Sequence, residues 1–582
     1  MPVRFSTAAL IALSLVAPLA GATELASIEK PELRTLAARA FTLDREQEVR
    51  IEGVTADVRS SWSPARIWLL DAASRKNVWD VVDATLARPR HGLARFEASV
   101  RLPAGDYELY LATFPGSSGK WDRHGVDIHE LMGRLQEYMD LDGLEDVVRE
   151  LEVHVSGDGS ALAGDAAAAI RERLARGAAA AVLGVGDGAD GSAGFALRAP
   201  ASVRVVCYGE VYSDGAYDGG WIEDVDTGAQ VWRFDERDSE KAGGAGKNRV
   251  VDAVVKLPAG RYVAGFATDD SHSSLEFNAP PPDDPFAWGI VVRPAGAGDV
   301  AAVEPFAADG ARPRNLIAAL TEVRDREQRS AGFTLRRPLS VRVVAVGEGT
   351  RGEMNDLGWI VDARTHATVW EMDYDRTEHA GGSGKNRIEE KILQLPAGSY
   401  VAHFSTDGSH AYGDWNAAPP LERRRWGMTV AAADRSFTPE DVAPFDQHLE
   451  EAPALARVTR VRSDQERDAT FTLERDADVE IYALGESDGR DMADFGWIED
   501  ARSGKTVWEM QYRDTEPAGG SKKNRAFRGT VHLPAGDYRV RYESDGSHAY
   551  GDWNADPPRD PDAWGITVTL AERLPAEAAP SR

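Results

Sequence analysis

One sequence unit occurs three times in this chain at a constant spacing. The unit contains a Gly-Trp-Ile segment whose tryptophan is Trp221, Trp359 or Trp497, and both intervals, 359 − 221 and 497 − 359, are 138 residues. Units of about 20–50 residues stack into solenoids with one shared core, whereas a period of this length repeats whole domains. The repeat therefore predicts a tandem array of domains.

A degenerate fourth copy precedes these three. Trp68 and Trp79 are 11 positions apart (79 − 68), as are Trp221 and Trp232 (232 − 221), and residues 102–107 are identical to residues 533–538. We call the four copies modules 1 to 4, in chain order. The predicted organisation is a signal peptide (1–22), module 1 (23–157), an Ala- and Gly-rich linker (158–190), module 2 (191–295), module 3 (314–433), module 4 (452–572) and a tail (573–582).

Apolar residues alternate along the repeats with a period of two, as at Val341, Val343 and Ala345, and Gly- and Pro-rich turns separate the apolar stretches. This pattern is typical of short antiparallel strands. We therefore predict an all-β protein, a tandem array of four antiparallel β-sandwich modules of the jelly-roll or immunoglobulin-like kind. Two helices are predicted: a short insertion in module 1 at 127–139 and a linker helix at 165–176.

Residues 1–22 have the form of a secretory signal peptide. Arg4 provides a positive start, residues 8–17 are apolar, and residues 20–22 are small, as signal cleavage requires. We therefore expect a secreted or periplasmic protein with a bacterial Sec-type signal. No later run reaches the roughly 18 apolar residues that a membrane helix needs, so no transmembrane segment is predicted.

The chain is acidic, with a net charge of −28 from 67 basic and 95 acidic residues. Nucleic acid and anionic membranes are therefore disfavoured as partners, because both bind basic surfaces. Cys207 is the single cysteine, so no disulfide can form within the chain. Ala345 and Ala483 occupy the same position in the next two repeats, which favours a small core residue over a reactive thiol.

Strand direction predicts that three long loops of each repeat lie at one end of the sandwich. In module 3 these loops are 348–358, 377–387 and 407–426, and alternate connections in an antiparallel succession share an end. A hairpin centred on Ala397 would also place Arg387 opposite Asp407 as a cross-strand ion pair. Module 1 keeps the tryptophans and the turns but lacks the motifs of these three loops, so we expect the loops to serve function.

A carbohydrate site is the first chemistry that the loops suggest. An exposed aromatic ring can cover the apolar face of a sugar while Asp, Asn and His bind its hydroxyls. A neighbouring loop, which contains the double-glycine motif Gly-Gly-x-x-Lys-Asn-Arg (381–387 in module 3), adds a Lys and an Asn. The predicted ligand-binding residues are His272, Glu276, Phe277 and Asn278 in module 2, Lys385, Asn386, His410, Asp414, Trp415 and Asn416 in module 3, and Lys523, Asn524, His548, Asp552, Trp553 and Asn554 in module 4.

Calcium is the one candidate cofactor, because six to eight oxygen ligands are needed and the same loops are rich in carboxylates. Zinc is disfavoured by the single His of each loop set. In the alternative structural interpretation, Trp415 closes the end of the sandwich, and Ser409, Asp414 and Asn416 cap turns. The predicted calcium ligands are Glu348, Asp356, Asp407, Glu486, Asp494 and Asp545, and Glu210 and Asp218 recur at the same spacing in module 2.

Nucleotide binding and catalysis are both disfavoured. The Gly-rich stretch 381–387 precedes a predicted strand, whereas a Walker loop precedes a helix. Glu348 with Asp414, or His410 with Asp407, offers an acid–base pair, but the chain has no nucleophile elbow, HExxH helix or cofactor fingerprint. Three near-copies of one site also favour avidity over turnover.

The repeats share a framework of Phe-x-Leu (Phe-Thr-Leu in modules 3 and 4), Val-x-Val or Val-x-Ile, a Pro-Ala-Gly-x-Tyr turn and a final Trp-Gly-x-x-Val strand. This framework resembles the bacterial pre-peptidase C-terminal type of β-sandwich. The resemblance implies an extracytoplasmic accessory or binding role, with polymer binding common and calcium frequent. It covers neither the His loops nor the Asp-Trp-Asn segments.

We therefore expect a secreted, non-catalytic protein whose modules 2–4 each bind glycan or another extracellular polymer. The alternatives are a calcium-stabilised structural or adhesion scaffold, and a hydrolase or hydrolase accessory subunit.

Overall fold

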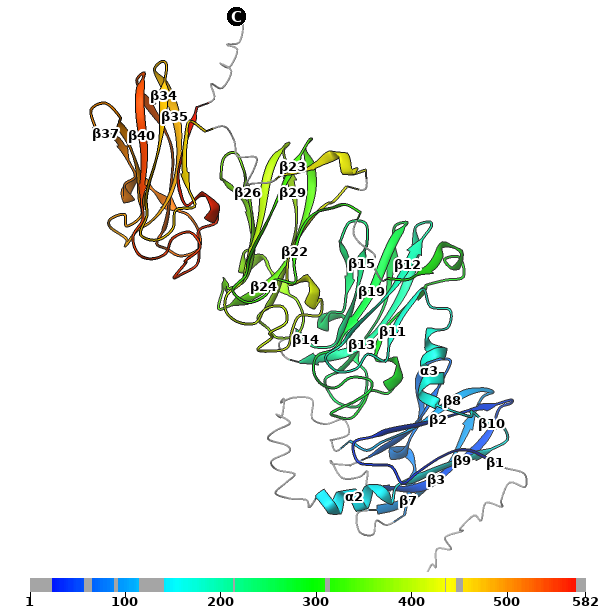
Figure 1. Ribbon diagram of the computed structural model, residues 1–582. Coiled ribbons are helices and arrows are strands. Elements are labelled where there is room, and N and C mark those ends of the chain that lie inside the picture. Colours follow the sequence, from blue (N-terminus) through cyan, green and yellow to red (C-terminus); the bar gives the residue numbers. More distant parts are fainter. Residues whose placement is uncertain are drawn as a thin grey trace, which may run out of the picture. The chain divides into compact units, whose positions relative to one another are not determined.

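The computed structural model describes residues 23–56, 65–87, 93–114, 141–212, 215–308, 314–434, 436–445 and 454–571. The predicted signal peptide, the predicted helix at 127–139 and the tail lie outside these residues. The regular secondary structure of the described residues is nearly all strand, with the two α-helices α2 (Leu141–Arg149) and α3 (Ala166–Ala175) (Figure 1). Every pairing between named strands is antiparallel. The predicted all-β fold of repeated sandwich-like modules is confirmed.

Modules 1 and 2 form one compact unit, and modules 3 and 4 form a second. Module 1 consists of two five-stranded sheets that enclose an apolar core. The first sheet has the order β1 (Thr23–Glu29), β9 (Glu152–Gly157), β3 (Gln47–Ala56), β7 (Leu93–Leu102) and β6 (Thr85–Leu86). The second has the order β10 (Ser160–Ala161), β2 (Leu36–Leu43), β8 (Gly105–Ala112), β4 (Arg66–Asp71) and β5 (Lys76–Asp80).

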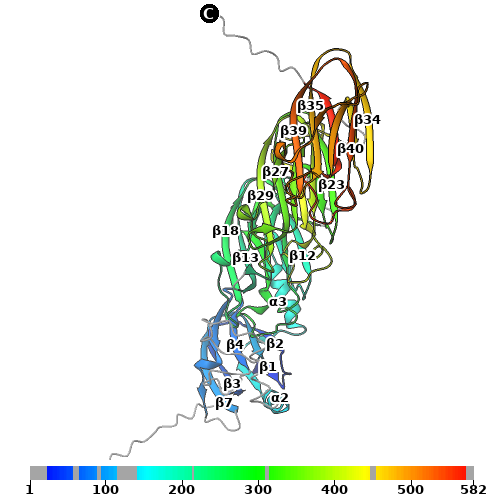
Figure 2. The ribbon, with the colours of Figure 1, turned by 90° about the vertical axis from the view of Figure 1, so that its left-hand side faces the viewer.

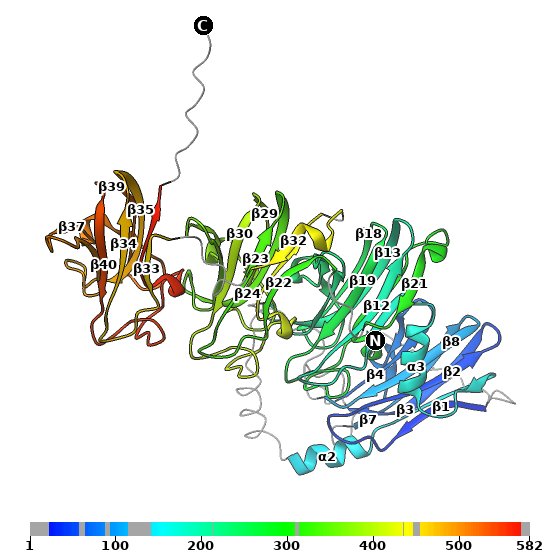
Figure 3. The same cartoon turned by 45° about the horizontal axis from the view of Figure 1, so that its top comes forward.

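Module 2 repeats this arrangement, and its two layers are separate in Figure 3, with β13 and β18 in one sheet and β12 and β19 in the other. The first sheet has the order β11 (Ala180–Leu183), β20 (Gly289–Pro294), β13 (Ala201–Tyr212), β18 (Asn248–Leu257) and β17 (Glu240–Lys241), with β14 (Gly215–Ala216) paired to β13. The second has the order β16 (Gln230–Arg233), β15 (Gly219–Asp224), β19 (Gly260–Ala267), β12 (Asp190–Leu197) and β21 (Val303–Phe306).

Module 3 has the same strand order as module 2. Its first sheet is β22 (Leu316–Thr321), β31 (Gly427–Ala432), β24 (Leu339–Thr350), β29 (Asn386–Leu395) and β28 (Glu378–His379), with β25 (Glu353–Met354) paired to β24. Its second sheet is β27 (Thr368–Glu371), β26 (Leu357–Asp362), β30 (Gly398–Ser405), β23 (Gln328–Leu335) and β32 (Val442–Pro444).

Module 4 keeps the order, and four strands of its second sheet lie among the described residues. The first sheet is β33 (Ala456–Thr459), β41 (Gly565–Leu570), β35 (Ala477–Glu486), β39 (Asn524–Leu533) and β38 (Glu516–Pro517). The second is β34 (Glu466–Leu473), β40 (Gly536–Glu543), β36 (Phe495–Asp500) and β37 (Thr506–Glu509).

The alternating apolar residues point into the space between the two sheets of each module. Val203, Val205 and Cys207 of β13 are all fully buried there. Burial also raises the pKa of the Cys207 thiol, so the side chain is a neutral core residue. The prediction that Cys207 packs in the core is therefore confirmed.

The predicted linker 158–190 carries more structure than a connection needs. Asp165 caps α3 by accepting from the backbone N–H groups of residues 167 and 168, and Ile170 and Leu174 of this helix are buried in the core of the first unit. The segment also supplies β10, which pairs with β2 of module 1, and β11, which pairs with β20 of module 2. It therefore binds both modules.

The Pro-Ala-Gly turn carries the chain from one sheet to the other, so the predicted ion pair between Arg387 and Asp407 is wrong. β29, before the turn, pairs with β24 in the first sheet, whereas β30, after it, pairs with β26 and β23 in the second sheet. Figure 2 shows the pair in module 2 that corresponds to β24 and β29, the adjacent strands β13 and β18. Arg387 instead donates to the Thr377 side chain (2.8 Å) and lies over the Tyr374 ring.

A tyrosine holds this crossing in every module. The Tyr400 hydroxyl donates to the carbonyl of Pro396, four residues earlier, at 3.0 Å. Tyr107, Tyr262 and Tyr538 make the same bond at 2.9, 2.9 and 2.7 Å. The Pro-Ala-Gly-x-Tyr motif is thus a corner between two sheets, comparable to the tyrosine corner of immunoglobulin-like sandwiches. Among the described residues, no helix has the length and apolar character to cross a membrane.

Candidate functional site

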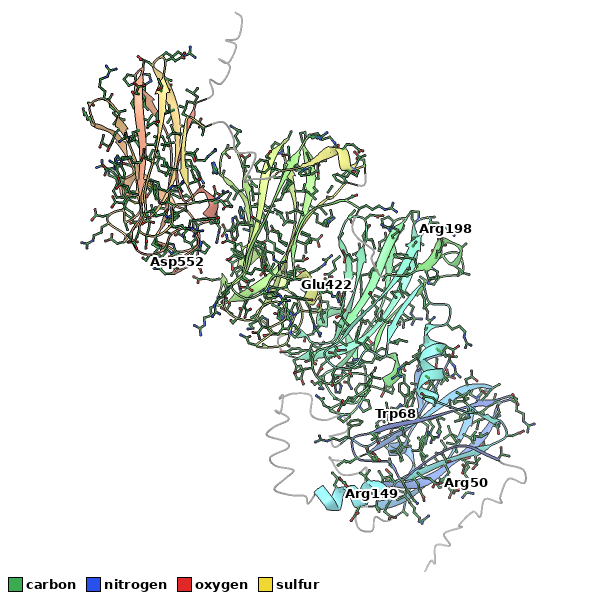
Figure 4. The ribbon with its side chains drawn as sticks, in the orientation of Figure 1. Arg50, Trp68, Arg149, Arg198, Glu422 and Asp552 are labelled. Atoms are coloured by element: carbon green, nitrogen blue, oxygen red, sulfur yellow. The ribbon has the colours of Figure 1, made fainter. Side chains whose placement is uncertain are left out.

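Three loops meet at one end of each of modules 2–4, and we call this end the loop pole. In module 4 they are the acidic loop (487–494), the double-glycine loop (518–523) and the His loop (544–563). The backbone N–H of Asp545 donates to Asp494 Oδ1 (2.8 Å), and His548 Nε2 lies 2.6 Å from Asn524 Oδ1. The predicted convergence is confirmed. Figure 4 labels Asp552 in this His loop and Glu422 in the corresponding loop of module 3.

A buried His–Asn pair joins the His loop to the double-glycine loop. The Asn524 amide donates through Nδ2 to the carbonyls of Gly519 and Asp556, both at 2.9 Å, so its Oδ1 faces His548 Nε2 as an acceptor. The imidazole Nε2 therefore carries the hydrogen. The equivalent distances are 2.7 Å from His272 to Asn248 and 2.6 Å from His410 to Asn386.

These histidines are structural links in this conformation. All three are fully buried and have a positive φ, between 51° and 63°. Burial, followed by the charge of the nearby lysine, lowers the pKa of His410 and of His548 to about 4, and it lowers the pKa of His272 well below its ordinary value. The rings are neutral at pH 7 and do not face solvent, so the predicted ligand contacts of His272, His410 and His548 are not available on the surface.

The acidic residues of each pole form a compact triad. One carboxylate oxygen of each member lies within 4.8 Å of the others in Glu348–Asp356–Asp407 and in Glu486–Asp494–Asp545. Both triads were predicted as calcium ligands. A third triad, Glu210–Asp218–Asp269 in module 2, has the same geometry. The 138-residue offset was the signal that pointed to it, although Asp269 was absent from the predicted ligands.

The central carboxylate of each triad is tied to the core. Asp494 accepts from the Asp545 backbone through Oδ1 and from the indole N–H of Trp564 through Oδ2 (3.1 Å). Burial, together with the neighbouring carboxylates, raises the pKa of Asp494 to about 7 and that of Asp356 to about 8. Trp564 and its counterparts in modules 2 and 3 therefore have a second role beyond packing, which the sequence did not reveal.

A lysine of the double-glycine loop supplies positive charge beside each triad. Lys523 Nζ lies 2.8 Å from Glu486 Oε1 and also donates to Asn554 Oδ1. Lys385 makes the same pair with Glu348 (3.1 Å) and Asn416, and Lys247 with Glu210 (2.6 Å) and Asn278 (2.7 Å). The predicted site residues Lys385, Asn416, Lys523 and Asn554 are thus brought together.

One triad oxygen in each of modules 3 and 4 is buried without a hydrogen-bond donor. These atoms are Glu348 Oε2 and Glu486 Oε2, on residues that are 6% and 8% exposed. A buried carboxylate oxygen without a partner is unfavourable, and a bound cation would satisfy it. The all-oxygen donor set fits a hard cation such as calcium, and the nearby lysine would compete with that cation.

The aromatic residue of the His loop differs between modules. Trp415 and Trp553 are half-buried and meet Trp426 and Trp564 edge to face, with ring centroids 5.0 and 5.1 Å apart. The corresponding Phe277 is buried against Trp288. The polar neighbours are exposed in all three loops: Glu276, Asn278, Asp414, Asn416, Asp552 and Asn554.

The second glycine of the double-glycine loop is required by its surroundings. Gly520 has a φ of 63°, and a Cβ atom there would lie 2.0 Å from the carbonyl oxygen of Pro557. Gly244 is equally confined, with a φ of 66° and the Pro281 oxygen at 1.9 Å. Only glycine fits such a left-handed, crowded position. The loop leads into β18 or β39, both strands, in agreement with the sequence argument against a phosphate loop.

No protein-family model matches this chain, and no curated protein does.

Proposed function

We propose that the protein is a secreted, non-catalytic, multi-module binding protein whose modules 3 and 4 bind glycan or another extracellular polymer at their loop poles. The observation that supports this most is that Trp415 and Trp553 are only partly buried. Each tryptophan is flanked along the chain by an exposed aspartate and an exposed asparagine. An aromatic platform with adjacent hydroxyl-binding groups is the arrangement that sugar recognition uses.

The buried network beneath the platform supports the same proposal. The hydrogen bond between His548 and Asn524 ties the His loop to the double-glycine loop, and Trp564 packs edge to face against Trp553. A loop that is already ordered loses little entropy when it binds, so weak contacts are sufficient for useful affinity. Two such poles on one chain would add avidity on a repetitive polymer.

Module 2 is expected to contribute little to this binding. Its aromatic residue is Phe277, which is buried, so the ring offers no platform to a ligand. Leu275, two positions earlier, is 62% exposed, but its aliphatic side chain offers no flat ring. The proposal therefore places the main sites in modules 3 and 4 rather than in all three repeats.

Retention on insoluble polysaccharides and on a glycan array tests the proposal. The double variant Trp415→Ala, Trp553→Ala should lose retention, because it removes both platforms. Trp415→Phe with Trp553→Phe is the conservative counterpart, since Phe277 occupies this position in module 2, and it should keep the fold with weakened retention. Full retention by the Ala variant, at a melting temperature close to wild type, would contradict the proposal.

A second candidate function is a calcium-stabilised adhesion scaffold. It is favoured by the buried unpartnered oxygens Glu348 Oε2 and Glu486 Oε2. The triads Glu348–Asp356–Asp407 and Glu486–Asp494–Asp545 would hold the ion, together with Glu210–Asp218–Asp269. Calcium would neutralise like charges that the fold holds within 4.8 Å of one another and would thereby stabilise the pole.

Calorimetry with excess calcium or excess chelator tests this candidate. Calcium should raise the melting temperature of the wild type, and the variant Glu348→Gln, Glu486→Gln should lose most of that increase and keep only the part due to the module 2 triad. The matched control is Asp414→Asn with Asp552→Asn, which removes the same number of carboxylates from exposed positions of the same loops. An identical melting temperature with calcium and with chelator would remove calcium from consideration and leave the glycan proposal intact.

A further inference from the structure

The same contact between consecutive modules occurs in both compact units. In the first unit, the indole Nε1 of Trp68 donates to the backbone carbonyl of Asp283 (2.8 Å), and Arg75 binds the Asp284 carboxylate (2.6 Å). In the second unit, Trp359 Nε1 donates to the carbonyl of Arg559. His366 Nδ1 lies 2.6 Å from Asp560 Oδ2.

The residues that meet are equivalent in the repeat. Residues 283 and 284 correspond to residues 559 and 560, because 559 − 283 is 276, twice the repeat of 138. Arg75 and His366 both lie in the turn of the hairpin that follows the tryptophan strand, between β4 and β5 and between β26 and β27. Two contacts built from the same positions indicate one recognition mode.

Both tryptophans are covered on one face by their own sheet. Trp68 stacks on Tyr110 at 5.0 Å and 16°, and Trp359 stacks on His403 at 5.2 Å and 8°. Trp68 and Trp359 are 0% and 1% exposed, so the next module covers what their own sheets leave open. Figure 4 labels Trp68 on module 1.

Proline restricts the backbone of the segment that is recognised. Asp284 precedes Pro285 at the start of the 3-10 turn η3 (Pro285–Ala287), and Asp560 precedes Pro561 at the start of η9 (Pro561–Ala563). Proline fixes its own φ and restricts the preceding residue to extended conformations, so the carbonyl and the carboxylate are presented in a defined direction. In the first unit, Arg75 also binds the fully buried Glu108 (2.7 Å), so Asp284 completes a buried network.

We propose that Trp68 with Arg75, and Trp359 with His366, are docking surfaces that recognise the Asp-Pro segment of the following module, so that modules 1–2 and modules 3–4 are each one cooperative docked pair. The indole N–H donates to the backbone carbonyl of the residue before the aspartate. The basic hairpin residue binds the aspartate carboxylate. The partner of each surface is therefore another module of this repeat type, and the inference is independent of any ligand at the loop pole.

Module 4 carries the same tryptophan but not the docking surface. Trp497 Nε1 donates to Glu499 of its own strand (2.8 Å), and the Arg541 guanidinium lies over its ring at 5.2 Å. The hairpin position of Arg75 and His366 is Gly504, which has no base to offer. The Trp497 indole is therefore satisfied within module 4 and is not available to an Asp-Pro segment.

Three matched variants of the full chain test the proposal: Trp68→Phe, Trp359→Phe and Trp497→Phe. Each removes one indole N–H and keeps an aromatic ring. We expect Trp68→Phe to increase amide hydrogen exchange at 283–287 and Trp359→Phe to increase it at 559–563, because each segment loses its anchor. Trp497→Phe should leave exchange in both segments unchanged. Equal exchange in all three variants and the wild type would overturn the proposal.

A double-mutant cycle on His366→Ala and Asp560→Asn gives a second measurement that does not depend on a tryptophan. We expect each single variant to separate module 3 from module 4 in calorimetry, with a new transition about 4 °C or more below the main one. The double variant should be no worse than the more damaging single variant. Strictly additive effects would show that the two residues do not recognise each other and would also overturn the proposal.

Discussion

The loop poles of module 2 and module 4 contain the same network but differ in how far it opens to solvent. In module 2, all three triad residues, the histidine and Phe277 are buried. In module 4, Asp545 is exposed and Trp553 is half-buried. The comparison teaches that one set of hydrogen bonds can either close the end of a sandwich or support a surface for ligands. Whether the pole is closed or open depends on the exposure of the third triad residue and of the aromatic residue of the His loop.

The largest expected effect in this comparison comes from the central carboxylate. Asp218→Ala leaves the Trp288 indole N–H and the Asp269 backbone N–H without acceptors in a buried site. Each orphaned donor costs about 1–3 kcal/mol, so we expect a loss of about 2–6 kcal/mol for Asp218→Ala in denaturant unfolding. Asp494→Ala should lose less, because water reaches the pole beside the exposed Asp545. An equal loss at both sites would break the comparison.

An aromatic exchange between the two poles should have the next largest effect. Phe277→Trp forces a larger ring into a filled site and should destabilise module 2 by about 1–3 kcal/mol. Trp553→Phe places the smaller ring in a half-open site, and its loss should stay below about 1.5 kcal/mol. Thermal unfolding of both variants provides the measurement. If Phe277→Trp leaves the stability of module 2 unchanged, the loop pole of module 2 has room for a tryptophan platform.

Calcium sharpens the comparison through access to the triads. The module 4 triad includes the exposed Asp545, whereas the module 2 triad is enclosed. In the presence of calcium, we therefore expect Glu486→Gln to reduce the calcium-dependent rise in melting temperature more than Glu210→Gln does. If Glu210→Gln has the greater effect, openness does not determine which triad binds the ion.

The smallest expected effect is that of acid, which protonates the buried histidines of the loop poles. The pKa of His548 is lowered to about 4 from an ordinary 6.5, mainly by burial. A base with a depressed folded-state pKa contributes stability above its unfolded pKa, and this contribution is lost as the pH falls toward the folded value. His548 should therefore take up its proton near pH 4, and burial also lowers the pKa of His272 well below its ordinary value.

Histidine-specific NMR titration of the full chain follows both rings directly. His548→Asn assigns the module 4 signal, and asparagine tolerates the positive φ at this position. A His548 resonance that titrates near pH 6.5 would show that the ring is open to solvent and not held by Asn524.

Much of the fold could be predicted because it depends on local periodicity. Alternating residues such as Val203 and Val205 identify strands whatever their partners are, and the repeat fixed the number of modules. The path at Pro396-Ala397-Gly398 could not be predicted in this way, because the same short turn can join two strands of one sheet or lead to the opposite sheet. The hydrogen bond from the Tyr400 hydroxyl to the Pro396 carbonyl marks the path that crosses to the opposite sheet.

The sequence predicted which loops form the candidate site but not how deeply each of its residues is buried. Strand direction placed the acidic, double-glycine and His loops at one end, and the hydrogen bonds of Asp494 and Asn524 confirm this. Whether a histidine faces ligand or core depends on packing against a distant tryptophan, and residue type alone carries no information about that. The contribution of Trp564 to the triad was missed for the same reason, since 70 residues separate it from Asp494.

The internal bond of Trp497 to Glu499 has a consequence for assembly. A repeat protein whose last copy still displayed an unsatisfied indole and a basic hairpin would accept the first suitable segment of another molecule and grow into filaments. In module 4, the Trp497 indole is already occupied and Gly504 offers no charge. We therefore expect this face of module 4 not to bind the Asp-Pro segment of a second molecule.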